Sequence, residues 1–121
     1  MTHRKTRFAV IGAGRIGSHH ARILGKHPDV ELVAVCDPNI WRAQLSAWRA
    51  GALAHRDPMD ILGRIDAAVV AVPTEKHFEV GMALLSKGIH CLIEKPLAST
   101  LDEAKSLLAA AQEHKAVLQV G

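Results

Sequence analysis

Apolar and polar positions follow two alternating patterns along the chain. Short apolar runs, which predict strands, occur at Arg7–Ile11, Glu31–Cys36, Ala52–His55, Ala67–Val72, His90–Ile93 and Val117–Val120. The run Ala67–Val72 has six consecutive apolar residues, as expected for a central parallel strand that is covered on both faces. Segments with helical periodicity separate these runs. Six strands joined by helical crossovers predict an α/β fold, a doubly wound parallel sheet of the Rossmann type with helices on both faces.

Capping and stop signals place the helices between the strands. Helices are expected over Arg15–Lys26, after Asn39, after Asp57 with Pro58 in the first turn, over about Glu75–Lys87 before Gly88, and after the capping box of Thr100 and Glu103. The inward stripes expected on them are Ile16, His20, Ile23 and Leu24; Trp41, Leu45 and Trp48; Phe78, Met82 and Leu85; and Leu101, Ala104, Leu108 and Ala111. Both tryptophans are therefore expected to pack in the core or in a groove.

The composition is that of a globular domain. With 121 residues, 49% of them hydrophobic and 22% charged, the chain forms one domain with a core of its own. A 3% share of aromatic residues and the absence of tyrosine argue against a nucleic-acid surface that stacks bases. No run approaches the roughly 20 apolar residues of a membrane span. We therefore predict a cytoplasmic protein with neither nucleic acid nor membrane as a partner.

The charged residues, cysteines and histidines do not indicate a further functional site. The net charge of +3 comes partly from a basic cluster at positions 3–7, which we interpret as a solvated tail. Cys36 and Cys91 fall in two different predicted strands and are expected to be reduced core thiols. The eight histidines are scattered, and the sequence indicates no metal site.

A glycine-rich turn follows the first strand and is the most informative motif. In Gly12-Ala13-Gly14-Arg15-Ile16-Gly17, the first glycine permits a tight turn, the second lets the backbone approach a pyrophosphate, and the third lets the helix pack closely. Asp37 ends the second strand twenty residues after Gly17, where a carboxylate accepts hydrogen bonds from an adenosine ribose. The pattern predicts a dinucleotide site. Its expected residues are Gly12, Gly14, Arg15, Ile16, Gly17 and Asp37.

Three other segments reach the carboxyl ends of the predicted strands, where doubly wound sheets bind ligands. These are Pro73-Thr74-Glu75-Lys76-His77, Glu94-Lys95-Pro96 and Gly121. Thr74 can cap the following helix and also face the cofactor, while His77 is either a site residue or a surface histidine. Lys95 can donate to a substrate hydroxyl or carbonyl and support proton transfer, although a solvated loop lysine fits the spacing equally well.

These segments together resemble a known family. The glycine turn through Ser18-His19-His20, the segments 71–77 and 88–98, and Gln119-Val120-Gly121 are similar to successive signatures of the Gfo/Idh/MocA oxidoreductases. The resemblance covers essentially the whole chain. It implies that Glu94 and Lys95 belong to the family's EKP motif, with the lysine beside the nicotinamide and the reacting carbon, and that the proline often follows a cis peptide. It also implies that Pro73, Thr74 and His77 run along the cofactor.

The same resemblance implies a second, larger α/β domain that supplies most of the substrate pocket, a catalytic Asp and His, and the subunit interface of a homo-oligomer. We expect residues 1–121 to be the cofactor domain of such a protein and to show no meaningful turnover alone. The implied reaction is hydride transfer between nicotinamide and a secondary alcohol of a sugar, nucleotide sugar or cyclitol. Alternatives are a non-catalytic dinucleotide-binding module and, less consistent with the motifs, an S-adenosylmethionine methyltransferase.

The residues after the second strand favour NAD over NADP. A carboxylate at Asp37 accepts from a 2′-hydroxyl and repels a 2′-phosphate, and Pro38 and Asn39 follow it directly without an arginine. Arg42 is close enough in sequence to keep NADP as an alternative.

Overall fold

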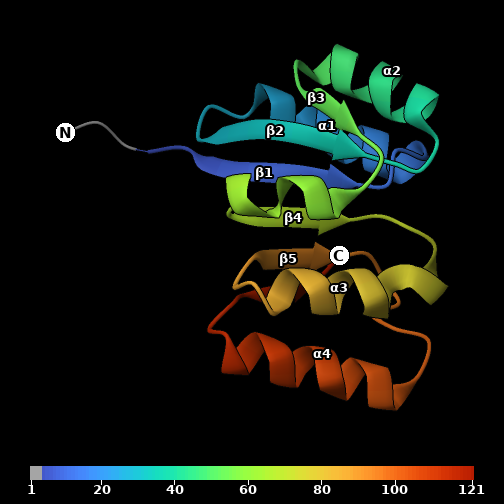
Figure 1. Ribbon diagram of the computed structural model, residues 1–121, viewed down its shortest axis with the longest axis vertical. Coiled ribbons are helices and arrows are strands. Elements are labelled where there is room, and N and C mark those ends of the chain that lie inside the picture. Colours follow the sequence, from blue (N-terminus) through green and yellow to red (C-terminus); the bar gives the residue numbers. More distant parts are fainter. Residues whose placement is uncertain (1–3) are drawn as a thin grey trace.

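The computed structural model describes residues 4–121, which form a six-stranded sheet between two layers of helices (Figure 1). The strands are β1 (Thr6–Ile11), β2 (Val30–Cys36), β3 (Leu53–His55), β4 (Ala67–Val70), β5 (His90–Ile93) and β6 (Leu118–Val120). Their order is β3-β2-β1-β4-β5-β6, and every neighbouring pair is parallel. The predicted doubly wound parallel sheet is therefore confirmed.

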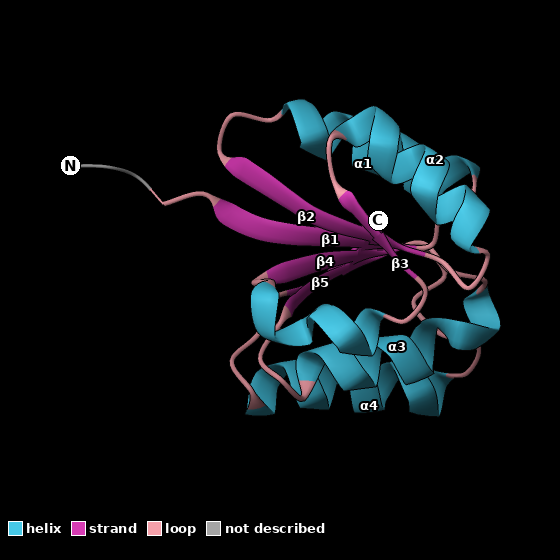
Figure 2. Cartoon of the chain, turned by 45° about the horizontal axis from the view of Figure 1, so that its top comes forward, coloured by secondary structure: helices cyan, strands magenta, loops and turns pink. Residues whose placement is uncertain are grey.

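The helices cover both faces of the sheet, as predicted. They are α1 (Arg15–Lys26), α2 (Ile40–Ala50), α3 (His77–Leu85) and α4 (Leu101–Glu113), with 3-10 turns η1 (Pro58–Arg64) and η2 (Thr74–Lys76). Figure 2 shows α1 and α2 on one face and α3 and α4 on the other. Because all strands run in one direction, their carboxyl ends and the helix starts that follow them gather at one edge, called here the carboxyl edge.

Alternate residues of each strand enter two separate cores. Val10, Val35 and Val69 pack under α1 and α2, whereas Ile11 and Val70 pack under η1, α3 and α4. Neighbouring residues of a strand point to opposite faces, so a strand covered on both sides is apolar throughout. This is why Ala67–Val70 is buried along its whole length.

Several element boundaries differ from the predicted ones. β4 ends at Val70 rather than Val72, and the predicted helix over 75–87 is a 3-10 turn followed by α3, which ends at Leu85. The segment after Asp57 is a 3-10 helix capped by the Asp57 carboxylate. The final strand starts at Leu118, one residue later than expected.

Three of the expected helical stripes are wrong in whole or in part: the stripe of α2 is exposed, whereas His20 and Leu24 of α1 and Ala104 and Ala111 of α4 are at least partly buried as expected. Trp41, Leu45 and Trp48 are exposed, while the buried residues of α2 are Ala43, Ser46 and Ala47. Ile16 and Ile23 are exposed on α1, where Gly17 and Ala21 are buried. In α4 the buried residues are Leu107, Ala110 and Ala111, and Leu101 and Leu108 are exposed. The expected packing of both tryptophans in the core or in a groove is therefore wrong.

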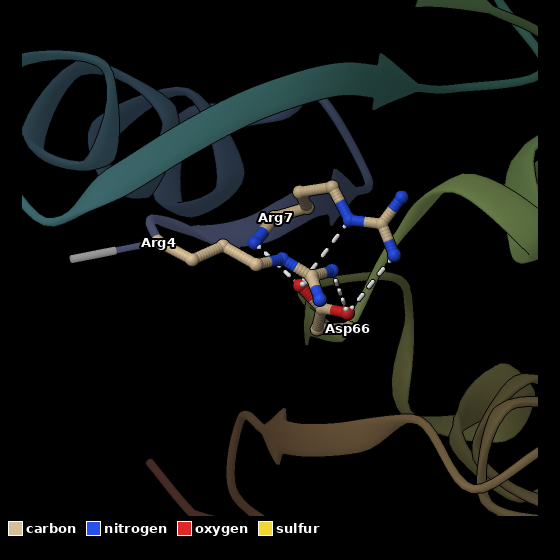
Figure 3. A network of polar contacts seen from close by, with 3 residues as sticks. All are labelled: Arg4, Arg7 and Asp66. Carbon is tan, nitrogen blue, oxygen red and sulfur yellow. Dashed lines mark hydrogen bonds and ion pairs between the residues drawn. The ribbon is translucent and has the colours of Figure 1, made fainter. Parts of the chain in front are cut away.

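The start of β1 is held by an ion-pair network at the amino edge of the sheet (Figure 3). Arg7 donates its backbone N–H to Asp66 Oδ2 at 2.9 Å and its Nη2 to Oδ1 at 3.1 Å, and Arg4 Nη2 lies 3.3 Å from Oδ1. Hydrogen bonds from Arg7 lower the pKa of Asp66 to about 2. The basic cluster is thus not simply a solvated tail, although His3 lies outside the described residues.

Candidate functional site

The turn between β1 and α1 leaves room only for glycine at two positions. Gly12 has a φ of +103°, and a Cβ there would lie 2.4 Å from the carbonyl oxygen of Ala71. A Cβ on Gly17 would lie 1.7 Å from the carbonyl oxygen of Gly12. Because both clashes involve backbone atoms, no side-chain movement relieves them. The turn therefore holds the start of α1 close against the ends of β1 and β4.

The N-terminus of α1 has no side-chain cap. Its N-cap residue, Gly14, offers no side chain, whereas Asn39 caps α2 and Thr100 caps α4 through side-chain oxygens. The first-turn N–H groups of α1 therefore receive no side-chain cap, and the helix dipole adds partial positive charge at the same place. Arg15 and Ile16 belong to this turn. A helix start with these properties is suited to a phosphate group.

Asp37 joins the glycine turn to the start of α2. Its side chain is buried, with the residue 8% exposed, and its Oδ2 accepts a 2.8 Å hydrogen bond from the N–H of Ala13. Its Oδ1 accepts a 2.8 Å hydrogen bond from the N–H of Asn39. Arg42 Nη2 lies 3.7 Å from Oδ2. A carboxylate oxygen has more than one lone pair, so the group keeps acceptor capacity toward a ligand while the backbone fixes its position.

Glu94 and Lys95 follow β5 at the same edge but have different surroundings. Glu94 is half-buried, and its Oε1 lies 2.5 Å from His20 Nε2 on α1. Lys95 is exposed, and within residues 4–121 its ammonium makes no hydrogen bond or ion pair. The Lys95–Pro96 peptide bond is cis, which agrees with the resemblance. The structure thus presents one fixed carboxylate and one available ammonium at the carboxyl edge.

His77 is almost completely buried and joins two loops of the carboxyl edge. Only 2% of the residue is exposed. Its Nδ1 lies 2.8 Å from the carbonyl oxygen of Pro96, and its Nε2 lies 2.9 Å from that of Val72. Both neighbours are acceptors, so the ring links the loop after β4 to the loop after β5. The ring therefore holds Pro96, the neighbour of Lys95, in place, and contact of His77 with a cofactor stays a prediction.

Pro73 and Thr74 lie at the carboxyl edge as expected, but Thr74 does not cap a helix. It begins η2, which has no side-chain cap, and α3 starts three residues later without one. The hydroxyl is therefore not engaged as a cap. Direct contact of Pro73 and Thr74 with a cofactor stays a prediction.

The contact between His20 and Glu94 was not predicted. The helical spacing predicts His20 on the inward stripe of its helix, and the structure shows that it carries the carboxylate contact that links α1 to the loop after β5. One signal was present in the sequence. His20 lies three residues after Gly17, which is the residue that packs α1 against the turn, and residues three apart share a helix face.

The remaining reactive side chains of the described residues offer no second centre. Burial raises the pKa of both Cys36 and Cys91 to about 12, so these thiols are unreactive core residues. Among residues 4–121, no three His, Cys, Asp or Glu side chains are grouped to hold a metal ion. No helix in this part of the chain has the length and apolar character needed to cross a membrane.

Comparison with known proteins agrees with this geometry. Residues 6–121 match the GFO_IDH_MocA family model, described as an oxidoreductase family with an NAD-binding Rossmann fold. The UDP-N-acetylglucosamine 3-dehydrogenase of Acidithiobacillus ferrooxidans is 36% identical over 122 residues, which cover 100% of this chain and 37% of that protein. The chain thus spans about a third of the length of the curated relatives it matches.

Solved structures with the same fold contain the expected cofactor. GenD2 from gentamicin A biosynthesis, in complex with NAD, has a TM-score of 0.94 and 32% identity, covering 98% of this chain and 34% of its own. The WlbA dehydrogenase of Chromobacterium violaceum, in complex with NADH and UDP-GlcNAcA, has a TM-score of 0.92 and 31% identity, covering 100% of this chain and 36% of its own. The chain therefore belongs to the Gfo/Idh/MocA oxidoreductase family and forms an NAD-binding Rossmann domain of that family.

Proposed function

We propose that the protein containing this chain is an NAD-dependent dehydrogenase that acts on a secondary alcohol of a sugar, nucleotide sugar or cyclitol. One observation carries the proposal: the available ammonium of Lys95 lies at the same edge as the glycine turn and the buried Asp37 carboxylate. A module that only binds a dinucleotide has no need of a cation there. Within the family, UDP-N-acetylglucosamine and inositol are the first substrates to test, because a UDP-N-acetylglucosamine 3-dehydrogenase and an inositol 2-dehydrogenase each match the whole chain.

The residues of the carboxyl edge fit the cofactor. The backbone of the turn approaches a ligand closely because Gly14 has no Cβ, and the open first turn of α1 provides N–H groups for a pyrophosphate. Asp37 stands where an adenosine ribose is bound in folds of this topology. When bound, NAD supplies the hydride chemistry through its nicotinamide.

The chain's own residues then orient and polarise the substrate. Lys95 donates a hydrogen bond to the reacting hydroxyl or carbonyl oxygen and supports the movement of its proton. His77 fixes the loop that carries Lys95 through Pro96, and His20 fixes Glu94. A domain of the same protein outside this chain would complete the substrate pocket. We accordingly expect residues 1–121 alone to show no meaningful turnover.

The decisive experiment replaces Lys95 with alanine in the protein that contains this chain. Turnover should fall by at least about ten-fold, since a general acid–base group contributes on the order of a hundred-fold or more. NAD affinity should stay within a few-fold, because the pyrophosphate is bound at the glycine turn. Reduction of the nicotinamide is followed by absorbance with UDP-N-acetylglucosamine, inositol and glucose, and NAD binding by calorimetry.

Lys87→Ala is the matched control, because Lys87 is also exposed but lies beyond α3 at the opposite edge. It should leave both turnover and NAD affinity unchanged. Near-normal turnover in Lys95→Ala would identify Lys95 as a solvated loop residue and favour the non-catalytic module. A parallel loss of NAD binding and turnover would make it a residue that holds the cofactor.

A further inference from the structure

Helix α2 carries an exposed apolar ridge. Trp41 is 78% exposed and Trp48 is 79% exposed, and Leu45 lies between them on the same stripe. The opposite side of α2 is buried at Ala43 and Ala47, and Ala47 belongs to the core on this side of the sheet. Large aromatic residues are seldom left this open in a folded protein, and a contiguous exposed apolar surface marks an interaction site.

The surroundings of this ridge are basic. A groove of about 650 Å³ lies beside it, between α1 and α2, and its walls include Arg15, Arg22, Arg42 and Arg49. Neither helix contains an Asp or a Glu. Among the described residues, Asp37 is the one carboxylate paired with any of these arginines, through Arg42. The face therefore combines apolar contact area with an excess of positive charge.

The arginines are arranged in two rows along the groove. Arg15 and Arg22 are seven residues apart on α1, and Arg42 and Arg49 are seven apart on α2. Seven residues of helix are two turns, or about 10 Å. A second helix with glutamates seven residues apart has the same spacing. Farther along, α1 and α2 lie close together, because a Cβ on Gly25 would lie 2.6 Å from the Ala50 carbonyl oxygen.

The groove also contains a polar atom without a partner. Ser46 lines it and is 6% exposed, and its hydroxyl makes no hydrogen bond within the described residues. A buried hydroxyl left in this state costs free energy, which an acceptor on a ligand would recover. A carboxylate or a backbone carbonyl that enters the groove is such an acceptor.

We propose that this α1–α2 face, formed by Arg22, Trp41, Leu45, Trp48 and Arg49, binds an acidic amphipathic helix of a partner protein. The partner's carboxylates pair with Arg22 and Arg49, because Arg15 and Arg42 lie at the dinucleotide site, and its apolar residues cover the ridge. A lipid bilayer fits less well, because its surface is flat over this distance: it would contact the exposed ridge but would not enter the groove that Ser46 lines. A second copy of the same face would bring like charges together.

The two tryptophans give a direct assay, because they are the only two in the chain. The probe is a tryptophan-free synthetic peptide of about 18 residues, long enough to form helix, with leucines on one stripe and glutamates seven apart. Binding should shift tryptophan emission to shorter wavelength as the ridge is covered. Added salt should weaken it. The double variant Arg22→Gln/Arg49→Gln should bind the peptide at least ten-fold more weakly.

The controls separate this face from general charge attraction. Lys87→Gln/Lys105→Gln removes the same charge from exposed positions elsewhere and should change the affinity less than two-fold. Leu45→Gln should weaken binding with the melting temperature unchanged. Equal binding of a peptide with glutamine in place of glutamate, or equal binding by Arg22→Gln/Arg49→Gln, would overturn the proposal. An emission shift that only phosphatidylglycerol vesicles cause would indicate a membrane surface and would also overturn the proposal. So would a shift that appears without peptide when the protein concentration is raised, because it would indicate self-association.

Discussion

Helices α1 and α4 both begin at the carboxyl edge of the sheet, but only α4 has a side chain that caps its first turn. At α4, Thr100 Oγ1 accepts a 3.1 Å hydrogen bond from the N–H of Glu103, and Glu103 Oε1 accepts a 3.2 Å hydrogen bond from the N–H of Ser99. At α1, the N-cap is Gly14 and no side chain caps the turn. The first arrangement stabilises the fold, and the second keeps backbone donors for a ligand.

The missing cap of α1 is informative beside the side-chain caps at the starts of α2, η1 and α4. Asn39 serves α2 and Asp57 serves η1. A side-chain cap typically stabilises a protein by about 1 kcal/mol relative to alanine. Among the described α-helices, α1 and the shorter α3 lack such a cap, and α1 is the one that follows the glycine turn, where a phosphate can supply the missing acceptor. The following predictions test this comparison, from the largest expected effect to the smallest.

Asp37→Ala should have the largest effect, because the carboxylate supports both α1 and α2. The change leaves the N–H groups of Ala13 and Asn39 without their acceptor, which costs about 1–3 kcal/mol for a buried donor. It also removes the carboxylate that repels a 2′-phosphate, so the preference for NAD over NADP should narrow. Thermal denaturation and calorimetry with both dinucleotides measure the two effects. Asp29→Ala, at an exposed position, should change neither; an unaltered preference in Asp37→Ala would contradict the assigned role.

Gly14→Ser should convert α1 into a helix that resembles α4. The hydroxyl would cap the first turn and raise stability by a few tenths of a kcal/mol. The added Cβ meets only the flexible end of Arg42, 2.9 Å away, so the fold should tolerate it. NAD affinity should fall by about ten-fold or more, because the side chain occupies the donors and blocks close approach of the backbone. Calorimetry that shows unchanged NAD binding would refute a functional reason for the missing cap.

Thr100→Ala tests the other side of the comparison. Loss of the hydroxyl removes the acceptor of the Glu103 N–H and should lower the free energy of unfolding by about 1 kcal/mol. NAD affinity should remain that of the parent chain. Urea denaturation monitors the first expectation and calorimetry the second. Thr100→Ser keeps the hydroxyl and should retain parental stability, and a fall in NAD affinity in either variant would show that α4 contributes to the site.

Asp66→Asn should give the smallest effect, since its carboxylate lies at the amino edge and takes no part in the site. Arg7 lowers the pKa of Asp66 to about 2, whereas the pKa of an aspartate in an unfolded chain is about 4. The ion pair therefore stabilises the protein above about pH 4, and this contribution is lost as the pH falls toward about 2. Partial exposure limits the effect to less than about 1 kcal/mol. Melting curves of Asp66→Asn and its parent should differ at neutral pH and converge in acid; a constant difference would exclude this linkage.

The helical stripes show where sequence periodicity identifies an element but not its buried face. In α2, Trp41, Leu45 and Trp48 have the correct helical spacing, and so do the smaller Ala43, Ala47 and Ala50. Periodicity alone assigns the larger residues to the core, yet alanine is what lets α2 pack closely on the sheet. In α4 the expected Ala111 is buried, but Leu107 and Ala110 are buried in place of Leu101 and Leu108.

The sequence by itself determined the features that depend on neighbouring residues: the strands and helices, the glycine turn with its positive φ at Gly12, the cap at Thr100 and the placement of Asp37 and Lys95 at strand ends. Only the tertiary structure decided which distant groups meet. His20 and Glu94 are 74 residues apart, and His77 reaches Pro96 across 19. Local pattern reflects the backbone preferences of adjacent residues, whereas these contacts exist because parallel strands bring separate loops to one edge.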